Sequence, residues 1–226
     1  MVLDRAEAYA GVLVDDLVTH GVSEPYRMFT SRAEYRLMLR EDNADDRLMP
    51  KGRELGLIDA TTWSAFKARS ASVKDTLSRL RETRLTPSDD TNKKLEAIGV
   101  EPISTPQTLA ELLRRPEVHI GSMAELDAPW VRDLEPEAAE KVEISIKYEG
   151  YIERQNRLVE RYRSLESVRL PSELDYSVVN GLSAEAIERL KAANPENMGQ
   201  ASRLPGVTPA AVQALMIHLR KRQNAA

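Results

Sequence analysis

The sequence predicts an all-α protein, on three observations. Residues that begin and end helices recur along the whole chain of 226 residues, and no segment shows the alternation of β-branched residues between turns that indicates a strand. Prolines are frequent between residues 86 and 136, and the stretch Leu170-Pro171-Ser172 is typical of a linker. We therefore expect an elongated multi-helix arm over residues 1–170, with a proline-broken connecting region near 86–136, and a small C-terminal helical domain over residues 171–226.

The composition favours a soluble chain and excludes several kinds of site. Hydrophobic residues make up 42% and charged residues 30% of the chain, which is the balance of a globular protein. No apolar run is long enough to cross a membrane and no secretory signal is recognisable, so a cytoplasmic location is expected. There are no cysteines, and the three histidines are isolated, so disulfides, thiolate metal sites and other metal sites are not predicted. The net charge of −4 leaves local basic patches open.

The first helix is predicted from about Asp4, a residue type that caps helices, to His20. Gly21 stands where glycine commonly ends a helix. The core face of this helix is expected to contain Ala10, Leu13 and Leu17, with Val14 beside them.

A second helix is predicted to begin near Ser31, because Ser31 and Glu34 have the spacing of a capping box. Arg32, Arg36 and Arg40 would follow at i, i+4 and i+8, so that their guanidinium groups stack along one face of this helix. The pattern predicts an arginine ladder.

Two interpretations of the ladder remain open. With Arg27 before it, Arg53 after it and Tyr35 within it, the ladder can bind phosphate oxygens and stack on an unpaired base of RNA. Acidic residues in the same window, such as Glu34 and Asp42, can instead hold the arginines in ordinary ion pairs.

Long helices are predicted on either side of the proline-rich region. From Asp59, apolar residues recur at helical spacing as far as Leu80. Pro136 suits the first residue of another long helix, which runs to about Ser167. Arginines and tyrosines on that helix could line an RNA groove, but glutamates lie among them, which favours a solvated face.

Near the C-terminus, Ser183 and Thr208-Pro209 predict the starts of two further helices. The segment around Gly206 has the outline of a helix-hairpin-helix turn, whose backbone amides can hold a phosphate, although Thr208 replaces the usual second glycine. A capped helix start with an apolar face explains the same residues equally well, and such a face can dock a partner protein. The candidate partner-binding residues are Arg203, Val212, Leu215, Leu219, Arg220 and Lys221.

Several runs carry a family resemblance. They are EPYRMFTSRAEYRL at residues 24–37, REDNAD at 40–45, GRELGL at 52–57, KYEGYI at 147–152, LDY at 174–176, GLS at 181–183, GQASR at 199–203 and PGVTPAA at 205–211. In this order they closely resemble the MnmG (GidA) family, and the likeness spans nearly the whole chain.

The resemblance implies an FAD-dependent enzyme that works with the GTPase MnmE on C5 of the wobble uridine of certain tRNAs, with NADH and a folate-derived one-carbon donor. The family's dinucleotide-binding fold lies upstream of the helices seen here, so the chain is similar to the C-terminal third of an MnmG. We therefore expect no catalytic residue, metal or cofactor site within it.

For this part of an MnmG, the resemblance implies a tRNA-binding arm followed by a domain that docks MnmE, within a homodimeric enzyme. The alternative is a protein-protein interaction module, for MnmE docking or dimerisation, without direct RNA contact. The candidate tRNA-binding residues are Arg27, Arg32, Arg36, Arg40, Arg53 and Tyr35.

Overall fold

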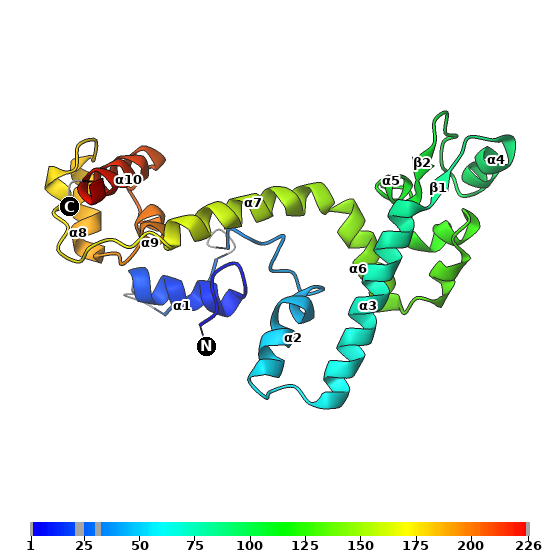
Figure 1. Cartoon of the computed structure of the whole chain (residues 1–226), viewed down its shortest axis with the longest axis horizontal. Coiled ribbons are helices and arrows are strands. Elements are labelled where there is room, and N and C mark those ends of the chain that lie inside the picture. Colours follow the sequence, from blue (N-terminus) through cyan, green and yellow to red (C-terminus); the bar gives the residue numbers. More distant parts are fainter. Residues whose placement is uncertain (1, 21–24, 30–32, 225–226) are drawn as a thin grey trace. The chain divides into compact units, whose positions relative to one another are not determined.

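The computed structural model describes residues 2–20, 25–29 and 33–224. Among these residues helices dominate, and the strands are two pairs of residues, Arg84–Leu85 (β1) and Gln107–Thr108 (β2), joined in antiparallel register. The prediction of an all-α fold is confirmed (Figure 1). The chain forms two compact units, one of residues 1–36 and 155–226 and the other of residues 37–154, and each is described here by itself.

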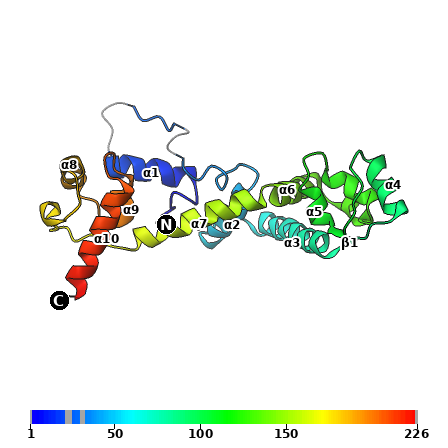
Figure 2. The same cartoon turned by 90° about the horizontal axis from the view of Figure 1, so that it is seen from above.

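The second unit contains the two long helices α3 (Ala60–Glu82) and α6 (Pro136–Lys147), which lie side by side (Figure 2). The predicted start of α3 is confirmed, because the Asp59 side chain accepts hydrogen bonds of 2.9 Å from the amides of Thr61 and Thr62. The shorter elements of this unit are α2 (Ala44–Glu54), α4 (Asp89–Ala97), α5 (Leu109–Leu113) and the 3-10 helices η2 (Ile120–Glu125) and η3 (Pro129–Asp133).

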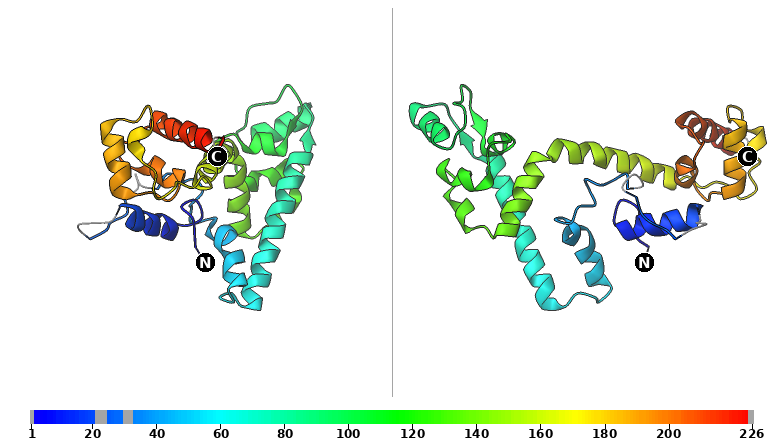
Figure 3. Two further views of the ribbon diagram at one scale, coloured as in Figure 1. Left: turned by 60° about the vertical axis from the view of Figure 1, so that its left-hand side comes forward. Right: turned by 180° about the vertical axis from the view of Figure 1, so that it is seen from behind.

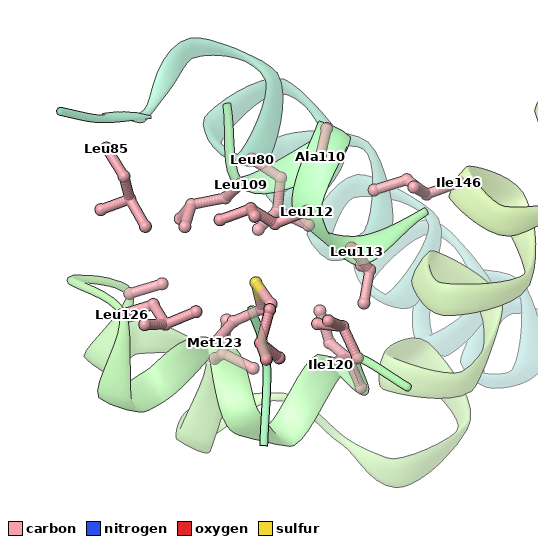
Figure 4. Packing of buried hydrophobic residues seen from close by; sticks show 14 of the residues in the cluster. Leu80, Leu85, Leu109, Ala110, Leu112, Leu113, Ile120, Met123, Leu126 and Ile146 are labelled. Carbon is pink, nitrogen blue, oxygen red and sulfur yellow. The ribbon is translucent and has the colours of Figure 1, made fainter. Parts of the chain in front are cut away.

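The proline-rich segment 86–136 forms short helices, as expected, but it does more than connect. It supplies most of the buried side chains of the second unit, including Leu109, Leu112 and Met123, which are fully enclosed. In Figure 4 the side chains of α5 face those of η2 across this core. Prolines that interrupt a helix therefore allow a chain to fold back on itself and enclose an apolar cluster.

The helix predicted from Pro136 to about Ser167 is interrupted at Tyr148, so the prediction of one continuous helix is wrong. Tyr148 ends α6 with φ −100° and ψ 3°, and α7 (Glu149–Glu166) begins at the next residue. The Glu149 carboxylate accepts hydrogen bonds from Arg81, at 2.9 Å, and from Arg114. The start of α7 is thereby tied to α3 and to the end of α5.

In the first unit, three helices pack into a small bundle (Figure 3): α8 (Ala184–Ala193), α9 (Met198–Arg203) and α10 (Pro209–Asn224). The predicted starts at Ser183 and Thr208 are confirmed, since each side chain accepts a hydrogen bond from an amide in the first helical turn. Helix α9 was not predicted. A 3-10 turn, η4 (Tyr176–Val178), precedes α8.

The stretch expected to be a linker begins in the core of the first unit and continues with the exposed residues Pro171 and Ser172. Leu170 is buried, and its amide donates a 2.9 Å hydrogen bond to the Glu196 carbonyl. The Met198 amide donates a 2.8 Å hydrogen bond to the Val168 carbonyl. The two segments therefore pair over one antiparallel bridge, between Arg169 and Asn197. Leu170 therefore belongs to the core, and sequence alone gives no sign of the long-range pairing that holds it there.

The first helix begins later than expected and buries a different face. Helix α1 covers Tyr9–His20, while the Asp4 side chain caps a preceding turn by accepting a 2.8 Å hydrogen bond from Ala6. Val12 is fully buried, whereas Leu13 and Val14 are exposed. A Cβ atom on Gly11 would lie 2.2 Å from the Asp4 carbonyl oxygen, so the N-terminal turn packs against the Gly11 face. The expected core face of Ala10, Leu13 and Val14 is wrong, and Gly21 lies outside the described residues.

The helix predicted near Ser31 is also wrong where the structure describes it. Residues 34–38 form turns instead of a helix, so Arg36 and Arg40 are not arranged on one helical face. Ser31 and Arg32 lie outside the described residues. The next helix, α2, begins only at Ala44.

Candidate nucleic-acid interface

A buried ion network occupies the first unit and uses several of its charges. The Arg5 guanidinium donates hydrogen bonds to Glu34 at 2.9 Å, to Asp15 at 3.0 Å and to Asp16 at 2.8 Å. Tyr26 donates a 2.7 Å hydrogen bond to the other oxygen of Asp16. Burial alone would lower the pKa of Arg5, but these carboxylates outweigh burial and raise it. The Arg5 side chain therefore remains charged.

Arg203, a candidate partner-binding residue, belongs to the same network. Its guanidinium contacts Asp15 of α1 at 3.1 Å and Glu166 at the end of α7 at 2.9 Å, and its side chain is only 13% exposed. Arg203 thus joins α9 to α1 and α7 within the first unit.

Tyr35, a candidate for stacking on a base, is enclosed. Its ring packs edge-on against Tyr162 with the ring centres 6.1 Å apart, and 5% of the residue is exposed. Burial raises the pKa of the Tyr35 hydroxyl, and the neighbouring Glu34 adds to this effect. The face of Tyr35 is not available for an RNA base in this structure.

The candidate arginines are separated by their local contacts. Arg27 is exposed and lies over the Phe29 ring at 5.8 Å. Arg36 is also exposed. In the second unit, Arg40 forms a two-point ion pair with Asp42 at 2.9 and 3.0 Å, and Arg53 donates a 2.6 Å hydrogen bond to the Ile58 carbonyl.

Helix α10 divides the candidate partner-binding residues between core and surface. Leu215 is fully buried and Leu219 nearly so, Val212 is partly buried, and all three pack in the core of the first unit. Arg220 and Lys221 are exposed near the end of the helix. Among the candidate partner-binding residues of α10, these two cations are the ones that can meet another molecule without unfolding the bundle.

The turn before α10 contains a glycine with a positive φ and has an acidic neighbour. Gly206 adopts φ +86°, and a Cβ atom there would lie 2.8 Å from a carboxylate oxygen of Glu185. The positive φ favours glycine at this position, whereas the Glu185 carboxylate lies at the end of a flexible side chain that can move aside. Glu185 also places negative charge beside the turn around Gly206, whose backbone amides the sequence pattern offers as a phosphate site.

Helix α7 carries exposed arginines on the face that the sequence pattern predicts to be solvated. Arg157 and Arg161 form no ion pair with any described residue, although Glu153 and Glu160 lie on the same helix. Arg154 lies 5.0 Å over the Tyr151 ring. Tyr151 and Leu158 are exposed by 56% and 49%. Arg157, Leu158 and Arg161 belong to the first unit. By helix periodicity these three residues follow one side of α7, and we call them the α7 stripe.

Comparisons with known proteins identify the family. Residues 60–156 match the model of the C-terminal helical domain of the tRNA modifying enzyme MnmG/GidA, and residues 158–226 match the model of its C-terminal helical bundle. The chain belongs to the MnmG/GidA family. Two crystal forms of Aquifex aeolicus GidA resemble 97% of this chain at 37% identity, with TM-scores of 0.70 and 0.68. The chain spans about a third of their length, 34% and 33%.

The MnmG/GidA relationship implies FAD, and the residues present do not fit it. A dinucleotide site needs a parallel sheet with a glycine-rich turn into a helix, whereas the strands in the described part of this MnmG/GidA chain are two residues long and antiparallel. No flavin step is therefore assigned to these residues. Within the same ranges, no group of acids and histidines is arranged to hold a metal ion, and none of the helices is both long and apolar enough to span a membrane.

Proposed function

We propose that this chain is the tRNA-docking part of an MnmG-like enzyme that, with MnmE, modifies C5 of the wobble uridine. The observation that carries this proposal is the α7 stripe, because Arg157 and Arg161 are exposed and have no acidic partner among the residues described. An arginine that is already paired must give up that pair to bind a phosphate, whereas these two need not.

The third member of the stripe, Leu158, adds an exposed apolar surface beside the two arginines. The guanidinium planes of the arginines can also stack on unpaired bases. The stripe thus combines phosphate donors with a surface that suits a single-stranded region of RNA.

The test is a titration of the purified chain with tRNA over a range of salt concentrations. Replacing both arginines (Arg157→Ala with Arg161→Ala) removes two phosphate contacts. We expect binding to weaken by roughly tenfold or more at low salt, and the slope of log K against log salt to fall in magnitude by about 1.4 to 1.8.

The matched control is Arg189→Ala, since Arg189 is exposed on α8 and lies outside the stripe. This control should bind tRNA as the parent chain does. The proposal is contradicted if the control and the double variant lose tRNA affinity equally, or if the parent chain shows no measurable tRNA binding at low salt.

Arg27 and Arg36 are proposed as secondary tRNA contacts, because both are exposed. The double variant with Arg27→Ala and Arg36→Ala tests this region separately from α7. A loss of affinity confined to that variant would move the main RNA contact from α7 to residues 25–40.

A second candidate function is protein docking, and a specific observation favours it. Helix α1 exposes Tyr9, Leu13, Val14 and Val18, with exposed fractions between 38% and 76%, and apolar surfaces of this kind are common at protein interfaces. We propose that α1, or the cations Arg220 and Lys221, contacts MnmE or another part of an MnmG dimer. Association with purified MnmE that survives the loss of tRNA binding would support this second function.

A further inference from the structure

The first unit contains a polar pocket that lies apart from the α7 stripe. Its volume is about 500 Å³, within the range of roughly 300–1,000 Å³ that is usual for small-molecule sites. The lining residues are Glu166, Arg169, Leu170, Ser172, Asn194, Pro195, Glu196 and Asn197.

Two helices end at this pocket. Helix α7 ends at Glu166, and α8 ends at Ala193, where Asn194 closes the helix in the left-handed conformation with φ +43°. The last carbonyl groups of a helix have no partner within it, and they carry the negative end of the helix dipole. Because Glu166 and Asn194 both line the pocket, the C-terminal ends of two helices border the same space.

Two carboxylates add to this negative potential. One oxygen of Glu166 binds Arg203 at 2.9 Å, while Glu196 forms no ion pair in the described part of the chain and is exposed. Gly199 leaves room for this Glu166 side chain, because a Cβ atom there would lie 2.3 Å from Glu166 Cγ. The pocket wall is therefore built around a held carboxylate.

Arg169 is the one cation that lines the pocket. Its residue is exposed, so the long side chain can leave for solvent when another cation enters. Charged and polar groups dominate the rest of the lining, and they accept hydrogen bonds more than they donate them.

We propose that this pocket binds an organic cation, with a guanidinium or ammonium group directed at Glu196 and the ends of α7 and α8. The ligand chemistry can come from an arginine side chain of a peptide or from a free polyamine. This site is independent of the proposed tRNA contact, since it shares no residue with the α7 stripe.

The test is an NMR titration of the full chain, observing the backbone amides of residues 166–172 and 194–197. The probes are the peptide Gly-Arg-Gly, its citrulline analogue, spermidine and inorganic phosphate. Binding of the arginine peptide but not of spermidine assigns the site to a protein partner, and the reverse assigns it to a free polyamine. The uncharged citrulline analogue should leave the chemical shifts of these amides unchanged.

Substitutions of two residues that line the pocket test which charges bind the cation. Glu196→Gln should weaken cation binding roughly tenfold, and it leaves intact the hydrogen bonds that the Glu196 backbone makes. The matched control is Glu188→Gln, an exposed glutamate of α8 outside the pocket. Arg169→Ala should preserve or strengthen binding of the cation. The proposal is overturned if none of the cations shifts the pocket amides, or if phosphate binds there and Arg169→Ala abolishes that binding.

Discussion

The Arg5 guanidinium donates a 2.8 Å hydrogen bond to the Asp16 carboxylate, and both residues are almost fully enclosed, with 7% and 3% of their surface exposed. This pair joins the N-terminal turn to α1. Since Arg5 also binds Asp15 and Glu34, a single cation holds three carboxylates in place.

The substitution Arg5→Met should therefore destabilise the chain by about 3–5 kcal/mol, because it leaves buried acids without their cation. Urea unfolding followed by circular dichroism measures the change. The control Arg27→Met, at an exposed position, should cost less than about 0.5 kcal/mol. Equal costs at both positions would mean that the network contributes no net stability.

Glu149 makes the stability of the second unit depend on pH. Burial alone would raise the pKa of Glu149, but hydrogen bonds from Arg114 and Arg81 outweigh burial and lower it. A carboxylate with a lowered pKa in the folded state stabilises the fold above its unfolded pKa, near 4.5, and this contribution is lost as the pH falls through the folded pKa.

We expect the chain with Glu149→Gln to unfold at a lower temperature than the parent at pH 7, and the two midpoints to converge as the pH falls below about 4.5. Thermal unfolding over a pH series measures this difference. A difference in midpoint that stays constant down to pH 3 would show that the Glu149 charge is not the cause.

Two glycines in helices should respond oppositely to alanine. A Cβ atom on Gly150 would meet nothing within 4 Å, so Gly150→Ala should stabilise α7 by about 0.5–1 kcal/mol through the lower entropy of the unfolded chain. On Gly199 the Cβ atom would lie 2.3 Å from Glu166 Cγ, so Gly199→Ala should cost about 1–3 kcal/mol. Denaturant midpoints that shift in the same direction for both variants would refute this steric reading.

The core built by the proline-rich segment predicts a large effect at Leu112, which is fully buried. Leu112→Ala should cost about 2–5 kcal/mol, because it removes buried apolar surface and leaves a cavity. Leu158→Ala, at a position that is 49% exposed, serves as the control and should change stability by less than about 0.5 kcal/mol. A cost below about 1 kcal/mol at Leu112 would mean that the segment is loosely packed in solution.

Helix starts that depend on neighbouring residues could be predicted from the sequence. Asp59, Ser183 and Thr208 each bind amides within three residues, so the local pattern contains the whole interaction. The capping-box pattern near Ser31 predicts a helix that is absent from residues 34–38. Its glutamate, Glu34, instead binds Arg5, 29 residues away. A capping box and a long-range ion pair use the same glutamate, and spacing alone does not distinguish them.

The candidate site was harder to predict for a related reason. An apolar helical face looks the same in sequence whether it packs inside the unit, as Leu215 does, or remains exposed, as Leu13 does. Arginines also look alike, although Arg203 is held by two acids and Arg157 by none among the described residues. Only the positions of distant carboxylates separate structural arginines from those available to a ligand.

The division of the first unit into residues 1–36 and 155–226 has a consequence for the order of events during synthesis. Asp15 is synthesised before residues 37–154, whereas Arg203, which binds it at 3.1 Å, is synthesised after them. The second unit is continuous in sequence, so its core can close before residues 155–226 have been made. During synthesis, the acids of α1 therefore stay hydrated while the second unit folds, and the two segments of the first unit meet afterwards.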